Sequence, residues 1–137
     1  MNDLSQIPPL VGVLGLLVSF VIYAIVRSYD PGTDALKKIA DAIHEGAMVF
    51  MRREYSMLSM FAVVLLIGIY FTDGLGPKTA IAFLAGALSS MLAGWFGMYT
   101  ATQANVRTTT AAHNSGQAAA LSVAFFGGSI MGLAVAS

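Results

Sequence analysis

The feature that most constrains this chain is a set of four long apolar runs that contain no charged residue. They cover about residues 10–26, 56–72, 79–101 and 118–137. A helix rises about 1.5 Å per residue, so each run is long enough, or nearly so, to cross a hydrocarbon core of about 30 Å. The sequence therefore predicts an all-α integral membrane protein with four transmembrane helices, organised as one segment over residues 1–137.

Composition agrees with a membrane location and excludes several kinds of site. Only 10% of the residues are charged, against about 25% in soluble domains. The formal net charge of zero argues against a nucleic-acid partner, which would require an excess of basic side chains. The chain has no cysteine, so disulfides, thiolate catalysis and cysteine-ligated metals are excluded.

The first apolar run is interpreted as a retained helix and not as a cleaved signal peptide. It has no basic residue before it, and no small-x-small cleavage site follows it closely. Pro8 and Pro9 are expected just before its first turn, where a missing N–H costs little.

The second apolar run follows directly from an amphipathic segment, and neither proline nor paired glycines separate them. We expect one continuous helix over residues 34–71, capped by Thr33 or Asp34 and extended into the cytosol at its start. Asp34 and Lys38 are expected to pair at i,i+4. The expected packed face contains Leu36, Ile39, Ile43, Gly46, Ala47, Phe50 and Met57. The expected solvated face contains Lys37, Lys38, Asp41, His44, Glu45 and Arg52.

Small residues recur every four positions in the last two runs, which is typical of helices whose backbones approach closely. The first ridge is Ala82, Gly86, Ser90, Gly94 and Met98, and the second is Ala124, Gly128, Gly132 and Ala136. We expect Gly86 and Gly94 to lie against another helix. Trp95 and Tyr99 suit a membrane interface.

The polar stretch 103–117, with Arg107 and His113, joins these two runs and is either a loop or a helix, since it contains no proline. Five of the seven basic residues lie between the first two runs. The positive-inside rule therefore predicts an outside N-terminus, an outside turn at Asp73, and cytoplasmic segments 27–55 and 103–117. The fourth run is still apolar at Ser137, so we expect a truncated fourth helix and a chain that is a fragment of a larger polytopic protein.

Few residues suggest a catalytic, metal-binding or ligand-binding role. His44 and Glu45 are adjacent and lack metal-ligand spacing, and the acidic pair Asp41–Glu45 fits a solvated helix surface better than a cation site. The stretch 107–116, "RTTTAAHNSG", could contact a phosphate, although a polar helix end is the favoured interpretation. No ionisable residue lies in the middle of a run, where an ion pathway normally needs one. No catalytic, substrate-binding or metal-binding residue is predicted.

Three sequence pieces together resemble the N-terminal region of the membrane-bound, ion-translocating inorganic pyrophosphatases. They are "IHEGAMVFMRREY" at 43–55, "GWFGM" at 94–98 and "ANVRT" at 104–108, and the resemblance covers about residues 35–137. His44 is a mild departure, because the family often has another basic or polar residue there. The resemblance implies a homodimeric pump that hydrolyses pyrophosphate at a cytosolic Mg²⁺ site and exports H⁺ or Na⁺ across a prokaryotic plasma membrane.

The resemblance assigns this chain a scaffold role, because the family's aspartate- and lysine-rich hydrolytic motifs lie on later helices. No family catalytic residue is carried onto a position of this sequence. The chain alone is therefore expected to be inactive, embedded in lipid and packed against the remaining helices of the pump. The alternative is a small stand-alone membrane protein that assembles through its small-residue ridges and has no catalytic activity.

Overall fold

The computed structural model describes residues 7–72, 74 and 76–137, and this part of the chain forms four α-helices without a strand. The helices are α1 (Ile7–Ser28), α2 (Asp34–Phe71), α3 (Gly76–Ser115) and α4 (Gln117–Ala136). Each is long and apolar enough to cross a membrane. The all-α class with four candidate spans is therefore confirmed.

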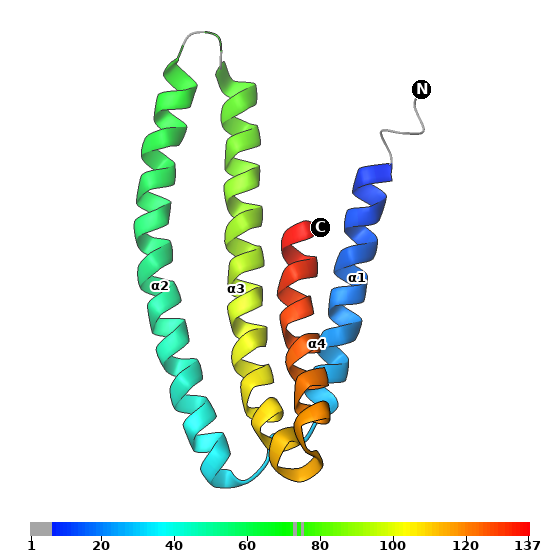
Figure 1. The fold of residues 1–137 in the computed structure, drawn as a ribbon. Helices are drawn as coiled ribbons and strands as arrows, with labels where there is room; N and C mark the ends of the chain where they lie inside the picture. The colour runs from blue at the N-terminus through cyan, green and yellow to red at the C-terminus, as the bar shows by residue number, and fades with distance from the viewer. Residues whose placement is uncertain (1–6, 73, 75) are drawn as a thin grey trace.

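The two central helices form a long antiparallel hairpin (Figure 1). With 38 residues in α2 and 40 in α3, the hairpin is about 57–60 Å long at 1.5 Å per residue. The hydrocarbon core accounts for only about half of that length. The polar first half of α2 and the polar second half of α3 therefore lie side by side at one end. The predicted continuity of α2 across Gly46 is confirmed.

The polar stretch after the third apolar run is helical, which settles the alternative left open by the sequence. It continues α3 without interruption to Ser115. Gly116, with a φ of 83°, then allows the reversal into α4, because residues with a side chain rarely adopt this left-handed region. Asp73, in the turn before α3, lies outside the described residues, so its expected position is not tested.

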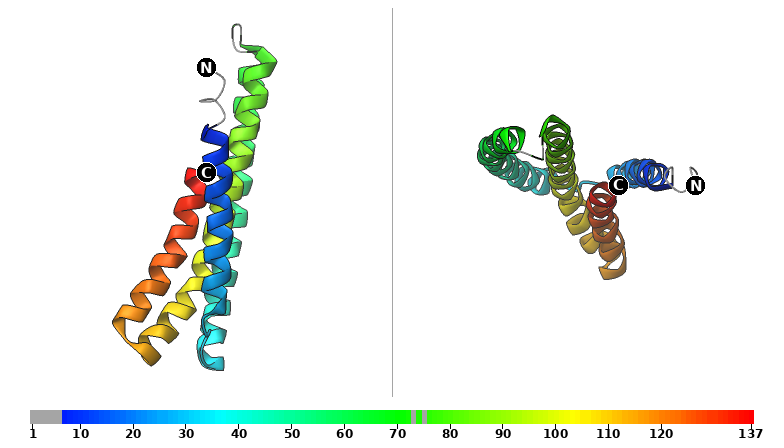
Figure 2. Two further views of the ribbon diagram at one scale, coloured as in Figure 1. Left: turned by 90° about the vertical axis from the view of Figure 1, so that its right-hand side faces the viewer. Right: turned by 90° about the horizontal axis from the view of Figure 1, so that it is seen from above.

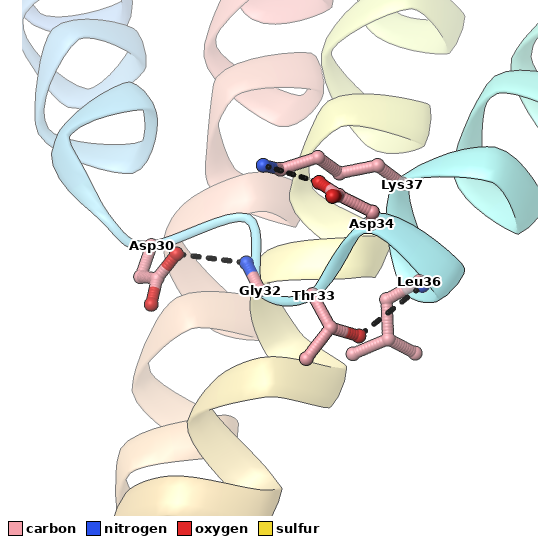
Figure 3. Close-up of polar contacts among 6 residues, drawn as sticks. All are labelled: Asp30, Gly32, Thr33, Asp34, Leu36 and Lys37. Atoms are coloured by element: carbon pink, nitrogen blue, oxygen red, sulfur yellow. Dashed lines mark hydrogen bonds and ion pairs between the residues drawn. The ribbon is translucent and has the colours of Figure 1, made fainter.

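The start of α2 is fixed by local hydrogen bonds (Figure 3). The Asp30 Oδ1 atom accepts from Gly32 N at 2.8 Å, and Thr33 Oγ1 accepts from Leu36 N at 3.5 Å as the N-cap. Lys37 Nζ lies 3.4 Å from Asp34 Oδ1. The expected partner of Asp34 was Lys38, so the i,i+3 neighbour replaces the i,i+4 neighbour. Both arrangements are accessible on a helix surface.

Across the bundle the helices follow the order α2, α3, α4, α1, which is seen from the side and from above (Figures 1 and 2). The buried cluster joins α1, α3 and α4 through Val26, Ala104 and Ile130. Phe96 packs against it, with its ring centroid 5.5 Å from that of Phe20. Ser19 Oγ donates to Ile130 O at 3.3 Å. Pro8 and Pro9 lie inside the first turn of α1 and not before it, which is tolerated because N–H groups there have no helical partner.

The face of α2 that contacts α3 differs from the predicted apolar face. Met51 is buried, and Leu36, Ala40, His44, Ala47 and Tyr55 are half-buried. In contrast, Ile39, Ile43, Phe50 and Met57 are between 49% and 69% exposed. Gly46 is also exposed, and no atom would lie within 4 Å of a Cβ placed there. The expected assignment of His44 to the solvated face and of Gly46 to the packed face was therefore wrong.

The small-residue ridges are used only in part. A Cβ at Gly94 would lie 2.7 Å from the Tyr55 hydroxyl, so this glycine does lie against another helix, as expected. For Gly86, Gly128 and Gly132, nothing lies within 4 Å of such a Cβ among the described residues. The expectation for Gly86 and for the α4 ridge is thus not met within this chain.

The close contacts between α3 and α4 use other glycines. A Cβ at Gly127 would lie 2.5 Å from Ala104 Cβ, and one at Gly97 would lie 2.7 Å from Met131 Cγ. Each of these glycines is one residue removed from a member of a predicted ridge, Gly127 from Gly128 and Gly97 from Met98. A shift of one residue moves a side chain about 100° around the helix, and therefore to a different neighbour.

Candidate functional site at the polar end of the bundle

The polar side chains of the bundle gather where the loop 29–33 lies beside the second half of α3. We call residues 29–44 and 102–116 the polar end. Gly32 in this loop has a φ of 85°, and a Cβ there would meet the hydroxyl of Thr110. The loop therefore approaches α3 as closely as a backbone without a side chain permits.

Arg107 is the charged residue that the fold buries, with a side chain only 8% exposed. Its Nη1 donates to Gln103 O at 2.7 Å and to Gln103 Oε1 at 3.2 Å. Its Nε is buried without a hydrogen-bond partner. Burial, and secondarily the positive charge of Arg27, lowers the pKa of the Arg107 guanidinium from its ordinary value.

Arg27 is the nearby cation at the end of α1. Its guanidinium carbon lies 6.0 Å from the centroid of the Tyr23 ring, at the edge of the range for a cation–π contact. Arg27 is exposed, so water solvates its charge. Arg107 has much less access to water.

A polar bridge between α2 and α3 starts at His44. His44 Nδ1 lies 2.7 Å from Thr102 Oγ1, and Thr102 Oγ1 lies 2.9 Å from Tyr99 O. Thr102 has one hydroxyl proton, so both bonds form together only when Thr102 donates to Tyr99 and His44 donates through Nδ1–H. The His44 ring meets Tyr99 edge-on with centroids 5.2 Å apart, and Tyr99 stacks on Trp95 at 5.5 Å.

A second bridge lies nearer the apolar half of the hairpin. The Tyr55 hydroxyl donates to Met91 O at 2.6 Å and occupies the space left by the missing side chain of Gly94. The glycine thus allows a tyrosine from α2 to reach the backbone of α3. Trp95 and Tyr99, which were expected at an interface, follow on the next turns of α3.

Two cavities flank Arg107. One, of about 90 Å³, lies between α2 and α3 and contains the side chains of Lys37, Asp41, His44 and Gln103 in its wall. The other, of about 130 Å³, is lined by Tyr29, Asp30, Asn114 and Ser115 among others. Each volume exceeds the roughly 10–15 Å³ that a single water needs.

The acidic candidates from the sequence do not converge. Asp41 and Glu45 are exposed, and His44 turns toward α3 away from its neighbour Glu45. Within residues 7–72, 74 and 76–137, no group of three or more histidine, aspartate or glutamate side chains could hold a metal ion.

Sequence reasoning missed the burial of Arg107, although a signal for it was present. Gly97, Thr100, Ala104 and Arg107 are buried at spacings of three and four on one face of α3. The first three are small, so they let α4 and α1 approach closely. Arg107, the next residue on this face, is consequently enclosed by the neighbouring helices. His113, in contrast, is exposed.

Four membrane-length helices, with a polar end built on two extended helices, define this chain as a polytopic helical membrane protein. A sequence profile described as inorganic H⁺ pyrophosphatase matches residues 13–137. The chain belongs to this family of membrane-bound, pyrophosphate-energised pumps.

Individual relatives support this membership. A putative K⁺-stimulated pyrophosphate-energized sodium pump of Clostridium tetani is 40% identical over 124 residues, covering 90% of this chain and 18% of the relative. A K⁺-insensitive pyrophosphate-energized proton pump of Methanosarcina mazei is 40% identical over 135 residues, covering 98% of this chain and 20% of the relative. The chain thus spans about a fifth of the length of these curated relatives.

Proposed function

We propose that this chain is the N-terminal portion of a pyrophosphate-energised ion pump and serves there as helical scaffold. The observation that carries the proposal is the family match over residues 13–137, combined with coverage of only 18–20% of the sodium- and proton-pumping relatives. The complete pump would couple cytosolic pyrophosphate hydrolysis to outward transport of H⁺ or Na⁺. Continuation of the protein beyond Ser137 is part of this proposal.

The proposal assigns the hydrolytic chemistry to the rest of the pump. Holding several Mg²⁺ ions around a pyrophosphate requires a dense set of carboxylates, whereas this chain has seven acidic residues in total. Mg²⁺ ligands, the partner helices and the second subunit of a homodimer would all come from outside this sequence. The N-terminus would be outside, with the polar end in the cytoplasm, in agreement with the distribution of basic residues.

A chimaeric pump tests the proposal. The matching segment of the Methanosarcina mazei proton pump is replaced by the present 137-residue chain, and pyrophosphate-dependent acidification of inverted vesicles is measured. We expect the chimaera to pump and the same relative without any such segment to fail. A chimaera that reaches the membrane in normal amounts but neither hydrolyses nor pumps would contradict the scaffold role.

The isolated chain provides a second test. Purified alone, it should release no phosphate from pyrophosphate in the presence of Mg²⁺ above a vesicle blank. Mg²⁺-dependent release would show that catalytic groups reside in this segment. If the chain instead assembles only with itself and never with the rest of the relative, the alternative of a stand-alone membrane protein is favoured.

A further inference from the structure

Arg107 is a buried cation without an ion-pair partner among the described residues. The side chain is 8% exposed and its Nε has no acceptor. In the described part of the chain, the ion pair found within 4.0 Å joins Lys37 and Asp34, so no described carboxylate lies within ion-pair distance of Arg107. Burying a charge is unfavourable unless it is paired and hydrogen-bonded. A bound anion would therefore stabilise this arrangement.

The charges around the two flanking cavities decide which one suits an anion. The 90 Å³ cavity between α2 and α3 is lined by two basic side chains, Lys37 and Arg107, and one acidic side chain, Asp41. His44 and Gln103 add further polar groups to its wall. The larger cavity contains Arg107 opposed by Asp30, so its charges balance. The net positive charge of its lining residues makes the cavity between α2 and α3 the better site for an anion.

The position of this cavity along the helices indicates what could reach it. Thr102 and Gln103 line it, and they follow directly after the third apolar run, which ends at about residue 101. The cavity therefore lies at the level where hydrocarbon gives way to headgroups and water. Lys37, on the rim, has a side chain that is 47% exposed, so it can exchange Asp34 for another anion.

We propose that this cavity binds a single phosphate group, held by the Arg107 guanidinium with Lys37 as an additional donor. An arginine fork matches the geometry of a phosphate oxyanion. The phosphate would be either the headgroup phosphodiester of an anionic phospholipid or free inorganic phosphate. The site differs from the stretch 107–116 considered from sequence, because it combines Arg107 with Lys37 from α2.

Two binding experiments on the delipidated, purified 137-residue chain distinguish the two sources. In detergent, inorganic phosphate is titrated while thermal unfolding is followed through Trp95, the single tryptophan. In bilayer nanodiscs, retention of phosphatidylglycerol over phosphatidylcholine is measured by native mass spectrometry. Saturable stabilisation by phosphate identifies the free anion, and selective retention of phosphatidylglycerol identifies the headgroup. If neither occurs, the proposal is wrong.

Variants test whether Arg107 provides the binding. Arg107→Gln should weaken binding at least about tenfold, the loss expected for a hydrogen bond to a charged group. Arg53→Gln removes the same charge from an exposed position and should bind as the wild type does. Lys37→Gln should weaken binding and Asp41→Asn should strengthen it, so these two decide the question if Arg107→Gln fails to fold. Equal losses in Arg107→Gln and Arg53→Gln would reveal only general charge attraction and would overturn the proposal.

Discussion

The contact between Gly127 on α4 and Ala104 on α3 allows a sharp test of the helix packing. A Cβ at Gly127 would lie 2.5 Å from Ala104 Cβ, about 1 Å closer than the roughly 3.5 Å at which carbon atoms attract best. Gly128 is the matched control, because no atom lies within 4 Å of a Cβ placed there. Both glycines are in the interior of the same helix, so Gly→Ala changes the helix propensity equally and the effect cancels in the comparison.

The expected difference follows from the cost of inserting a methyl group into a close contact. Overpacking of this kind typically costs about 1–3 kcal/mol, so Gly127→Ala should be less stable than Gly128→Ala by about that amount. The free energies of unfolding are measured by denaturant titration of the purified chain in detergent micelles, with helix content followed by circular dichroism. The wild type and both single variants are compared under one set of conditions.

A double-mutant cycle shows whether the named contact is responsible. Ala104→Gly removes the methyl group that Gly127→Ala would meet, so Gly127→Ala should cost much less stability in the Ala104→Gly background than in the wild type. The coupling between contacting residues should fall within about 0.5–3 kcal/mol. Equal stability of Gly127→Ala and Gly128→Ala, or an equal cost of Gly127→Ala in the wild-type and Ala104→Gly backgrounds, would refute this packing of α3 on α4.

Other measurements address the hairpin and its orientation. Gly94→Leu should reduce the yield of folded protein much more than Gly86→Leu, because only the former displaces a tyrosine hydroxyl 2.7 Å from the new Cβ; equal yields would contradict the packing of α2 on α3. Thr102→Val should cost about 0.5–1.5 kcal/mol in unfolding free energy, since it removes the acceptor of the histidine hydrogen bond. A cysteine at Lys38 should react with an impermeant thiol reagent only when the cytoplasmic face is open, and one at Asp73 should react from outside intact cells; the reverse pattern would invert the topology.

Much of the fold was predictable because membrane helices are determined by local properties. The apolar runs and the N-cap Thr33 are each set by a few neighbouring residues. The continuous helix α2, from Asp34 to Phe71, follows from an unbroken helical periodicity without proline. These features require no knowledge of which helix lies next to which.

The packed faces were not predictable in the same way, because lipid and protein both accept apolar side chains. Ile39, Ile43 and Phe50 form a regular apolar face, yet they are exposed in the described structure. The contacts of α2 instead use a mixture of side chains, including Met51, Ala40 and His44. Periodicity identifies an apolar face, but it does not show whether lipid or another helix covers that face.

The polar end shows most clearly what the sequence determined and what required the tertiary structure. The sequence by itself placed Arg107 in a polar stretch after an apolar run, and it predicted no dense cluster of carboxylates. Only the packing of α3 against its neighbouring helices buried the arginine to 8% exposure and left its Nε without a partner. The physical reason is that burial depends on how closely helix backbones approach. That distance is set by pairs such as Gly127 and Ala104, which lie far apart in the sequence.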